Sequence, residues 1–112
     1  MKEQSQTAPV IGAAKKADIE KWKATHADVR AFKQTDEEGN EHITYFRPPT
    51  FEDIDYAREV GAGDGQKIGL AMANNVRLGG SDQVMEQYRL KQGFMTAVLK
   101  LAKPIEGEVE KL

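Results

Sequence analysis

The apolar residues of this chain follow two different periodicities, one typical of helices and one typical of strands. Ile19 and Trp22 lie three residues apart, which predicts a helix over residues 14–25 with one narrow apolar face. Residues 29–33 and 42–47 are instead short segments rich in Val, Ile, Tyr and Phe, as strands are. The acidic, Gly-containing stretch between these segments has the composition of a turn. Together they predict a β-hairpin.

The second strand of this hairpin carries large side chains on both faces. Because side chains alternate along a strand, Ile43 and Tyr45 share one face while Thr44 and Phe46 share the other. A single core cannot cover both Tyr45 and Phe46. Either the strand lies between two layers, or the exposed aromatic residue contacts a partner. We also expect one edge of the hairpin to be free to accept a partner strand.

A helix is predicted directly after the hairpin. Pro48 and Pro49 end the second strand, because proline cannot donate a ladder hydrogen bond and restricts the residue before it. Thr50 is followed three residues later by Asp53, which resembles a capping box with Asp in place of the usual Glu. The helix is expected to cover residues 51–60.

Two further helices follow, over residues 66–78 and 83–102. Gly79 and Gly80 are expected to end the first of them as C-terminal glycines. Apolar residues of the last helix spread over about 200° of its circumference, whereas a helix that covers one core needs about 100°. The arc consists of Phe94, Met95, Ala97, Val98, Leu99, Leu101 and Ala102. We therefore expect the last helix to mediate association, with itself or with a client.

The predicted fold class is α+β, with an N-terminal helix, one β-hairpin and then three helices. A chain of 112 residues is long enough for one core and too short for two. Residues 1–13 are predicted to be a flexible N-terminal arm, because they are mostly polar and contain Pro and Gly. Residues 14–103 form the single domain, and residues 104–112 a flexible C-terminal tail.

Charge and composition exclude several classes of protein. A net charge of −2 gives no long-range attraction to nucleic acid or to an anionic membrane, so neither is an expected partner. The chain has no cysteine, hence no disulfide or thiolate metal site. No segment approaches the roughly 20 apolar residues that cross a bilayer. The polar first residues do not resemble a secretory signal, and a cytoplasmic location is expected.

No catalytic, cofactor-binding or metal-binding residue is predicted. The glycine-rich stretch 61–65 lacks the strand and the Gly-Lys-Ser/Thr of a phosphate loop and is interpreted as an interhelical loop. His26 and His42 have no nucleophile or second ligand at a suitable spacing, so both are interpreted as surface or helix-end residues. Asn75, which lies within an apolar stripe, is interpreted as a buried amide.

The segment around Gly79-Gly80-Ser81 could also be the turn of a DNA-binding helix-turn-helix. The first turn of its second helix would present Asp82, Gln83 and Glu86, and carboxylates repel phosphate. A small DNA-binding regulator is therefore the least favoured of the binding functions considered.

Several fragments, taken in order, resemble the small tail assembly chaperones of tailed bacteriophages and prophages. They are Trp22-Lys23 with Asp28-Val29, then Tyr45-Phe46-Arg47-Pro48, then Asn75-Val76-Arg77-Leu78-Gly79-Gly80. The resemblance covers residues 18–102. It implies a non-enzymatic protein in the host cytoplasm that binds the long tape-measure protein before or while the tail tube forms, and then leaves the particle.

The expected partner is therefore a protein, the tape-measure protein or another tail protein, with a homo-oligomer through the last helix as a further possibility. A structural tail protein that stays in the virion is the alternative. The candidate partner-binding residues come from the second strand and the last helix: Tyr45, Phe46, Phe94, Met95, Val98 and Leu99.

Overall fold

A computed structural model describes residues 9–112 of the chain as a mixed α+β fold. Its central element is a three-stranded antiparallel sheet with the order β1-β2-β3. The elements, in chain order, are α1 (Lys16–Thr25), β1 (Arg30–Thr35), β2 (Glu41–Phe46), α2 (Phe51–Gly61), α3 (Gly65–Val76), β3 (Arg77–Gly80), α4 (Asp82–Glu86) and α5 (Tyr88–Leu101).

The α+β class and the hairpin are confirmed, and so is the capping box. Strands β1 and β2 pair antiparallel from Arg30↔Phe46 to Thr35↔Glu41. The turn between them is closed by Asp36, whose Oδ1 accepts hydrogen bonds from two backbone amides at 2.9 Å. At the start of α2, the Thr50 side chain and the Asp53 side chain each accept from the other residue's backbone amide.

The predicted order of one hairpin followed by three helices is only partly right, because Gly79 and Gly80 do not end a helix. Helix α3 ends at Val76, and both glycines belong to strand β3, which pairs with β2. A Cβ on Gly79 would lie 2.8 Å from ring carbons of Trp22, and Gly80 has a φ of +121°. Glycine is needed here for close approach and a left-handed backbone rather than for a helix cap.

The predicted last helix, residues 83–102, is divided into α4 and α5. Gln87 between them has an extended backbone, with φ −93° and ψ 125°. Val84 and Leu90 are both buried in the core. In one straight helix their spacing of six would turn these side chains about 120° apart. The break allows both of them to face the same core.

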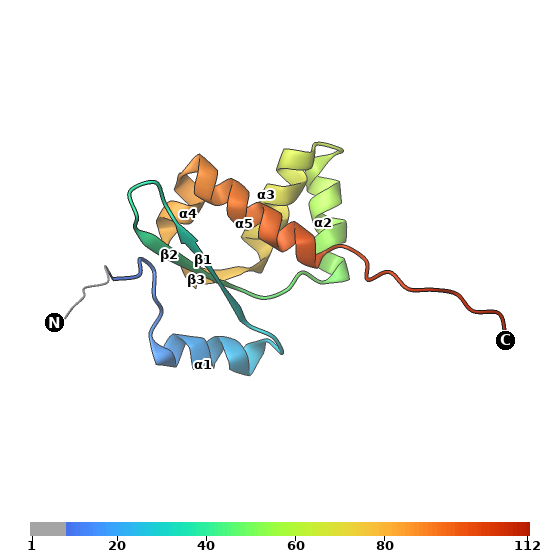
Figure 1. Cartoon of the computed structure of the whole chain (residues 1–112), viewed down its shortest axis with the longest axis horizontal. Coiled ribbons are helices and arrows are strands. Elements are labelled where there is room, and N and C mark those ends of the chain that lie inside the picture. The colour runs from blue at the N-terminus through green and yellow to red at the C-terminus, as the bar shows by residue number, and fades with distance from the viewer. Residues whose placement is uncertain (1–8) are drawn as a thin grey trace.

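Helices cover both faces of the sheet (Figure 1). On one face, the ring of Trp22 from α1 lies 5.3 Å from that of Tyr45, measured between centroids. On the other face, Phe46 meets Phe94 of α5 edge-on at 5.5 Å. Strand β2 is therefore sandwiched, which is one of the two alternatives that its sequence left open.

The larger core lies between the sheet and helices α2 to α5. Its buried side chains come from β2 and from all four of these helices: Phe46, Ala57, Met72, Ala73, Val76, Val84, Leu90, Phe94, Met95 and Val98. Helix α1 has no buried residue of its own. It is held mainly through Trp22, which packs on Tyr45 and Gly79.

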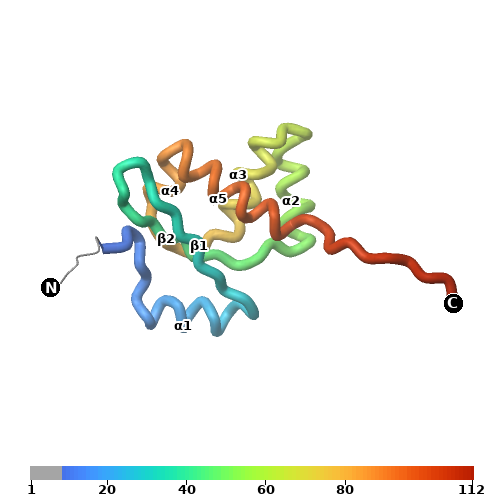
Figure 2. Tube along the Cα trace, viewed as in Figure 1, coloured from blue at the N-terminus to red at the C-terminus, as the bar shows by residue number. Residues whose placement is uncertain are grey.

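The two ends of the described chain behave differently (Figure 2). Within the predicted arm of residues 1–13, residues 1–8 lie outside the described part, but Ile11 is hydrogen-bonded to β2. Its amide donates to the Glu41 carbonyl at 2.8 Å, and its carbonyl accepts from Ile43 at 3.1 Å. Residues 104–112 have no secondary structure, are exposed and extend away from the helices.

We predict that Gly79→Ala loosens α1 from the sheet. The added Cβ would collide with Trp22, so the ring has to move. The free energy of unfolding should fall by about 1–3 kcal/mol, as for other overpacked sites. The emission of Trp22, the only tryptophan, should shift as well. Gly65→Ala is the matched control, because no atom lies within 4 Å of its added Cβ. Equal stability of the two variants would contradict this role of Gly79.

Candidate functional site

Five of the six predicted partner-binding side chains lie in the interior. Tyr45, Phe46, Phe94, Met95 and Val98 are all less than 9% exposed, and Leu99 is half-buried at the edge of the core. The wide apolar arc of α5 therefore packs against several elements at once. A free surface for a partner has to be sought among other residues.

Asp53 is the centre of a polar network that joins three elements. It is 3% exposed. Its carboxylate accepts from Arg47 Nη2 at 2.9 Å, from the Thr50 amide at 2.8 Å and from Asn75 Nδ2 at 2.8 Å. The network thereby connects the end of β2, the first turn of α2 and the last turn of α3.

This network keeps Asp53 ionised. The hydrogen bonds from Arg47 lower the pKa of Asp53 far below its ordinary value, and those from Thr50 act in the same direction against the effect of burial. All the oxygen acceptors of the carboxylate are engaged by its own fold. We interpret the group as structural, since both carboxylate oxygens are hydrogen-bonded within the fold.

The network also brings together two of the three sequence fragments quoted above. Arg47 belongs to the second fragment and Asn75 to the third, and both donate to Asp53. Asn75 was expected to be a buried amide, but this residue is exposed and only its amide group reaches inward. Sequence reasoning missed the network because Asp53 was assigned only to the helix cap.

His42, which was interpreted as a surface or helix-end histidine, is completely buried. Its Nε2 lies 2.8 Å from Asp36 Oδ2, and its Nδ1 lies 2.9 Å from Ser81 Oγ. The hydrogen bond with His42 is the main cause that lowers the pKa of Asp36. Because an ionised carboxylate can only accept, Nε2 carries the proton that it donates to Asp36.

These three residues match a hydrolytic triad in type but not in arrangement. In such triads the serine bonds to Nε2 and the acid to Nδ1, whereas here the two partners are exchanged. Ser81 is also 1% exposed, so a substrate cannot reach its hydroxyl. The hydrogen-bonded row of Asp36, His42 and Ser81 connects the hairpin turn to the residue before α4. Nothing in the local sequence pattern indicated it, because Ser81 and His42 are far apart in the chain.

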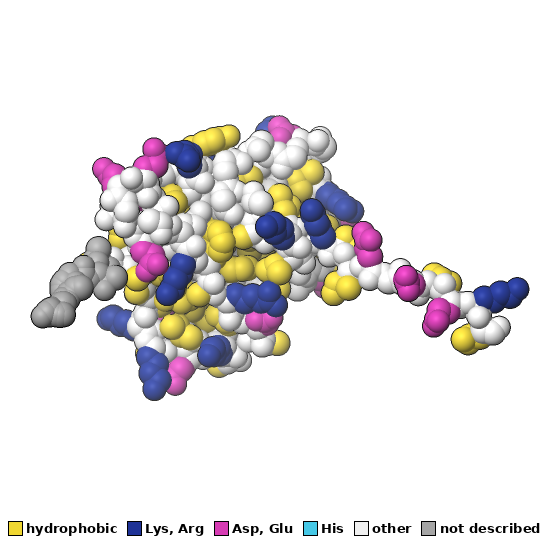
Figure 3. All heavy atoms as spheres, viewed as in Figure 1, with side chains coloured by type: hydrophobic (Ala, Val, Ile, Leu, Met, Phe, Trp, Pro, Cys, Tyr) yellow, Lys and Arg dark blue, Asp and Glu magenta, His cyan; other side chains and the backbone are white. Residues whose placement is uncertain are grey.

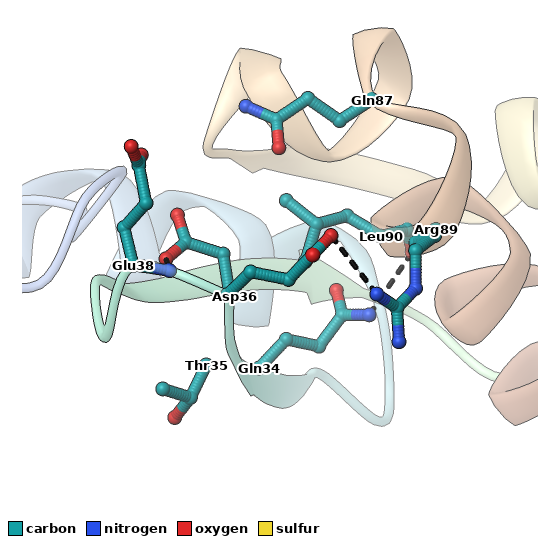
Figure 4. Close-up of a pocket in the computed structure, with 8 residues that line it drawn as sticks. Gln34, Thr35, Asp36, Glu38, Gln87, Arg89 and Leu90 are labelled. Carbon is teal, nitrogen blue, oxygen red and sulfur yellow. Dashed lines mark hydrogen bonds and ion pairs between the residues drawn. The ribbon is translucent and has the colours of Figure 1, made fainter.

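A polar hollow of about 580 Å³ lies between the hairpin turn and the start of α5 (Figure 4). Arg89 reaches across it to Glu37 at 2.9 Å, and both side chains are about three-quarters exposed. Deeper in, Gln34 Nε2 donates to the Leu90 carbonyl at 2.9 Å. An exposed ion pair of this kind contributes little to stability, so the hollow is a solvated surface feature.

A second surface has a different character and runs across three helices. One hollow of about 330 Å³ lies between α2 and α3, and another of about 160 Å³ lies between α3 and α5. They share Lys67 and Leu70, so we name them together the three-helix groove. Its residues are Tyr56, Val60, Gln66, Lys67, Leu70, Ala71, Asn74, Asn75, Tyr88, Lys91, Gln92 and Met95.

The three-helix groove exposes unusually large apolar side chains. Tyr56 and Val60 are each 51% exposed, and Tyr88 is 69% exposed. Lys67 and Lys91 lie beside them. No sequence prediction named these residues. The signal that was available is the spacing of Tyr56 and Val60, which lie four apart on α2 beside the buried line of Asp53, Ala57 and Gly61.

Over residues 9–112, no three or more His, Asp and Glu side chains come together in a way that could hold a metal ion. Within the same residues, every helix is too short or too polar to cross a membrane. No protein-family model, curated protein or solved structure matches this chain.

We predict that Asp53→Asn destabilises the fold in a pH-dependent way. Removing the charge weakens several hydrogen bonds and leaves Arg47 without its counter-ion, which should cost about 2–4 kcal/mol near neutral pH. Because the folded pKa of Asp53 is lowered, its contribution is present above about pH 4 and is lost as the pH falls below that value.

Urea unfolding over that pH range should therefore show the difference between wild type and Asp53→Asn shrinking with acid. Asp55→Asn is the matched control, since Asp55 lies exposed on the same helix, and its stability should stay close to wild type. A constant difference at all pH values would contradict the role of the charge.

We also predict that Ser81 does not react as a nucleophile. A fluorophosphonate probe should fail to label the native protein, because the hydroxyl is buried and hydrogen-bonded to His42 Nδ1. Ser81→Ala serves as the reference. Labelling of the wild type that disappears in this variant would show that the row is catalytic.

Proposed function

We propose that this protein is a non-enzymatic assembly chaperone or adaptor of the phage-tail type, which binds the tape-measure protein during tail assembly. The proposal rests on the exposed apolar three-helix groove together with the sequence resemblance. The buried ionisable residues Asp53 and His42 form hydrogen bonds with other residues of the fold. A protein-binding role agrees with this distribution of polar and apolar groups.

The groove favours an amphipathic helix as its occupant. Leu70 and Ala71 form part of its floor on α3, while Tyr56 and Val60 stand along α2. A contiguous row of half-exposed apolar side chains is typical of surfaces that bind other proteins. Helix-binding grooves hold their ligands through apolar anchors spaced three and four residues apart. Long tail proteins of this kind are expected to be helical and to present such stripes.

The positive charges of the groove indicate which charges the client helix carries. Lys67 lies where the two hollows meet, and Lys91 borders the second. We therefore expect a client helix whose apolar stripe is flanked by Asp or Glu. Charged residues at the rim of an interface mainly set orientation and the association rate, while the apolar anchors supply most of the affinity.

A tail protein that stays in the virion is the alternative function. It would use the same groove for a permanent neighbour, so the two functions differ in what the finished particle contains. Mass spectrometry of purified particles separates them: a chaperone is absent from the particle, whereas a structural protein is present in stoichiometric amounts.

We predict that Tyr56→Ser combined with Val60→Ser abolishes capture of the client without unfolding the protein. Both side chains are half exposed, so their loss should change the free energy of unfolding by less than about 1 kcal/mol. Loss of two central apolar anchors should weaken binding by at least about tenfold. Co-expression with a tape-measure protein, followed by affinity capture, measures this effect.

Phe51→Ser is the matched control. Phe51 lies on the same helix and is 75% exposed, but it is not among the residues of the groove. This variant should capture the client like wild type. Equal capture by all three proteins would exclude the groove as the client site, and capture lost only in Phe51→Ser would place the site at the start of α2.

A further inference from the structure

Strand β1 lies at one edge of the sheet. Its inner edge pairs with β2 over six residue pairs, and β2 is the centre of the sheet. Within residues 9–112, no strand or bridge pairs with the outer edge of β1. Such an edge presents backbone N–H and C=O groups that can bind a further strand.

The two faces beside this edge differ in chemistry. Phe32 points toward α5, with its ring 6.3 Å from that of Phe94, and is only partly buried. Lys33 is on the opposite face, toward α1, and is exposed. Strand β1 contains two cations and no acidic residue. Since Arg30 already pairs with Asp28 at 3.0 Å, Lys33 is the cation best placed for an added strand.

Apolar and basic side chains also occur together on the surface around the outer edge of β1. Figure 3 shows hydrophobic side chains gathered between α5 and α1, with Lys and Arg side chains among them. A strand laid along β1 would cover part of this apolar area on one face. Its other face would lie toward Lys33.

The C-terminal tail has the pattern that such a strand requires. In residues 105–110, Ile105, Gly107 and Val109 alternate with three glutamates. Alternation with a period of two places the apolar residues on one face and the carboxylates on the other. Gly107 disfavours a helix here. Ile105 and Val109 are 99% and 100% exposed, so neither side chain packs against any other part of residues 9–112.

We propose that residues 105–110 of one copy add as a fourth strand to the outer edge of β1 in a second copy. Ile105 and Val109 lie beside Phe32, and the glutamates lie on the face of Lys33. A second copy is the expected source of the strand because the tail leaves its own domain and extends away from it (Figures 1 and 2). The match combines backbone pairing, apolar contact and opposite charge.

The first test compares the full chain with a chain that ends at Lys103. The truncation is suitable because residues 104–112 are exposed and have no secondary structure. Light scattering after size-exclusion chromatography, over a dilution series, should show mass above that of a monomer for the full chain at high concentration. The truncated chain should remain a monomer throughout.

The second test uses a peptide of residues 104–112 added to the truncated chain. Hydrogen exchange should slow at the backbone amides of β1, and fluorescence anisotropy of a labelled peptide should report binding. A peptide in which all three glutamates are replaced by Gln should bind at least about tenfold more weakly at low salt, with less dependence on salt.

A charge exchange identifies the contact. Lys33→Glu should weaken self-association, and adding Glu108→Lys to the same chain should restore it at least in part. Lys67→Glu is the matched control, because Lys67 lies in the three-helix groove and should leave self-association unchanged. The two variants also distinguish self-association from client binding, because Lys33 belongs to the proposed contact between copies and Lys67 to the groove proposed for the client.

Three outcomes would overturn the proposal. One is a monomer at every concentration together with no binding of the peptide. Another is a full-length monomer whose β1 amides are protected, which would show that the tail pairs within its own chain. The third is protection by the peptide of α2 and α3 instead of β1, which would place the tail in the three-helix groove.

Discussion

Burial of strand β2 on all sides is the constraint on which the other elements depend. Its faces are covered by Trp22 on one side and Phe94 on the other, and its edges are bonded to β1 and to β3 with Ile11. An apolar strand with two covered faces requires helices on both sides of the sheet. Helix α1 supplies the thinner layer and α2 to α5 supply the thicker one.

The sequence predicted those parts of the fold that depend on local patterns. Alternation around Ile43, turn chemistry at Asp36 and the Thr50–Asp53 spacing each specify structure within a few residues, and each is found. Gly79 and Gly80 were misread because glycines after a helix commonly end it. Their actual role depends on a distant residue, Trp22, and no local pattern contains that information.

The candidate site illustrates the same limit. Both halves of a polar network were visible as sequence fragments, but their meeting point at Asp53 depends on how α2 and α3 pack. The wide apolar arc of the last helix suggested a free surface, whereas its central residues Phe94, Met95 and Val98 are buried in the core. Exposure is a tertiary property: the spacing of Tyr56 and Val60 places them together on α2, but only the folded chain shows that they and Tyr88 are exposed.

The light attachment of α1 has a consequence for how the molecule opens. With no buried residue and essentially one aromatic contact, this helix has the features of a unit that detaches well below the free energy of global unfolding. If α1 detached, the strand pairing and the larger core would remain, but the sheet face around Tyr45 would be exposed to solvent. Detachment of α1 would therefore expose the ring of Tyr45, which the closed molecule conceals.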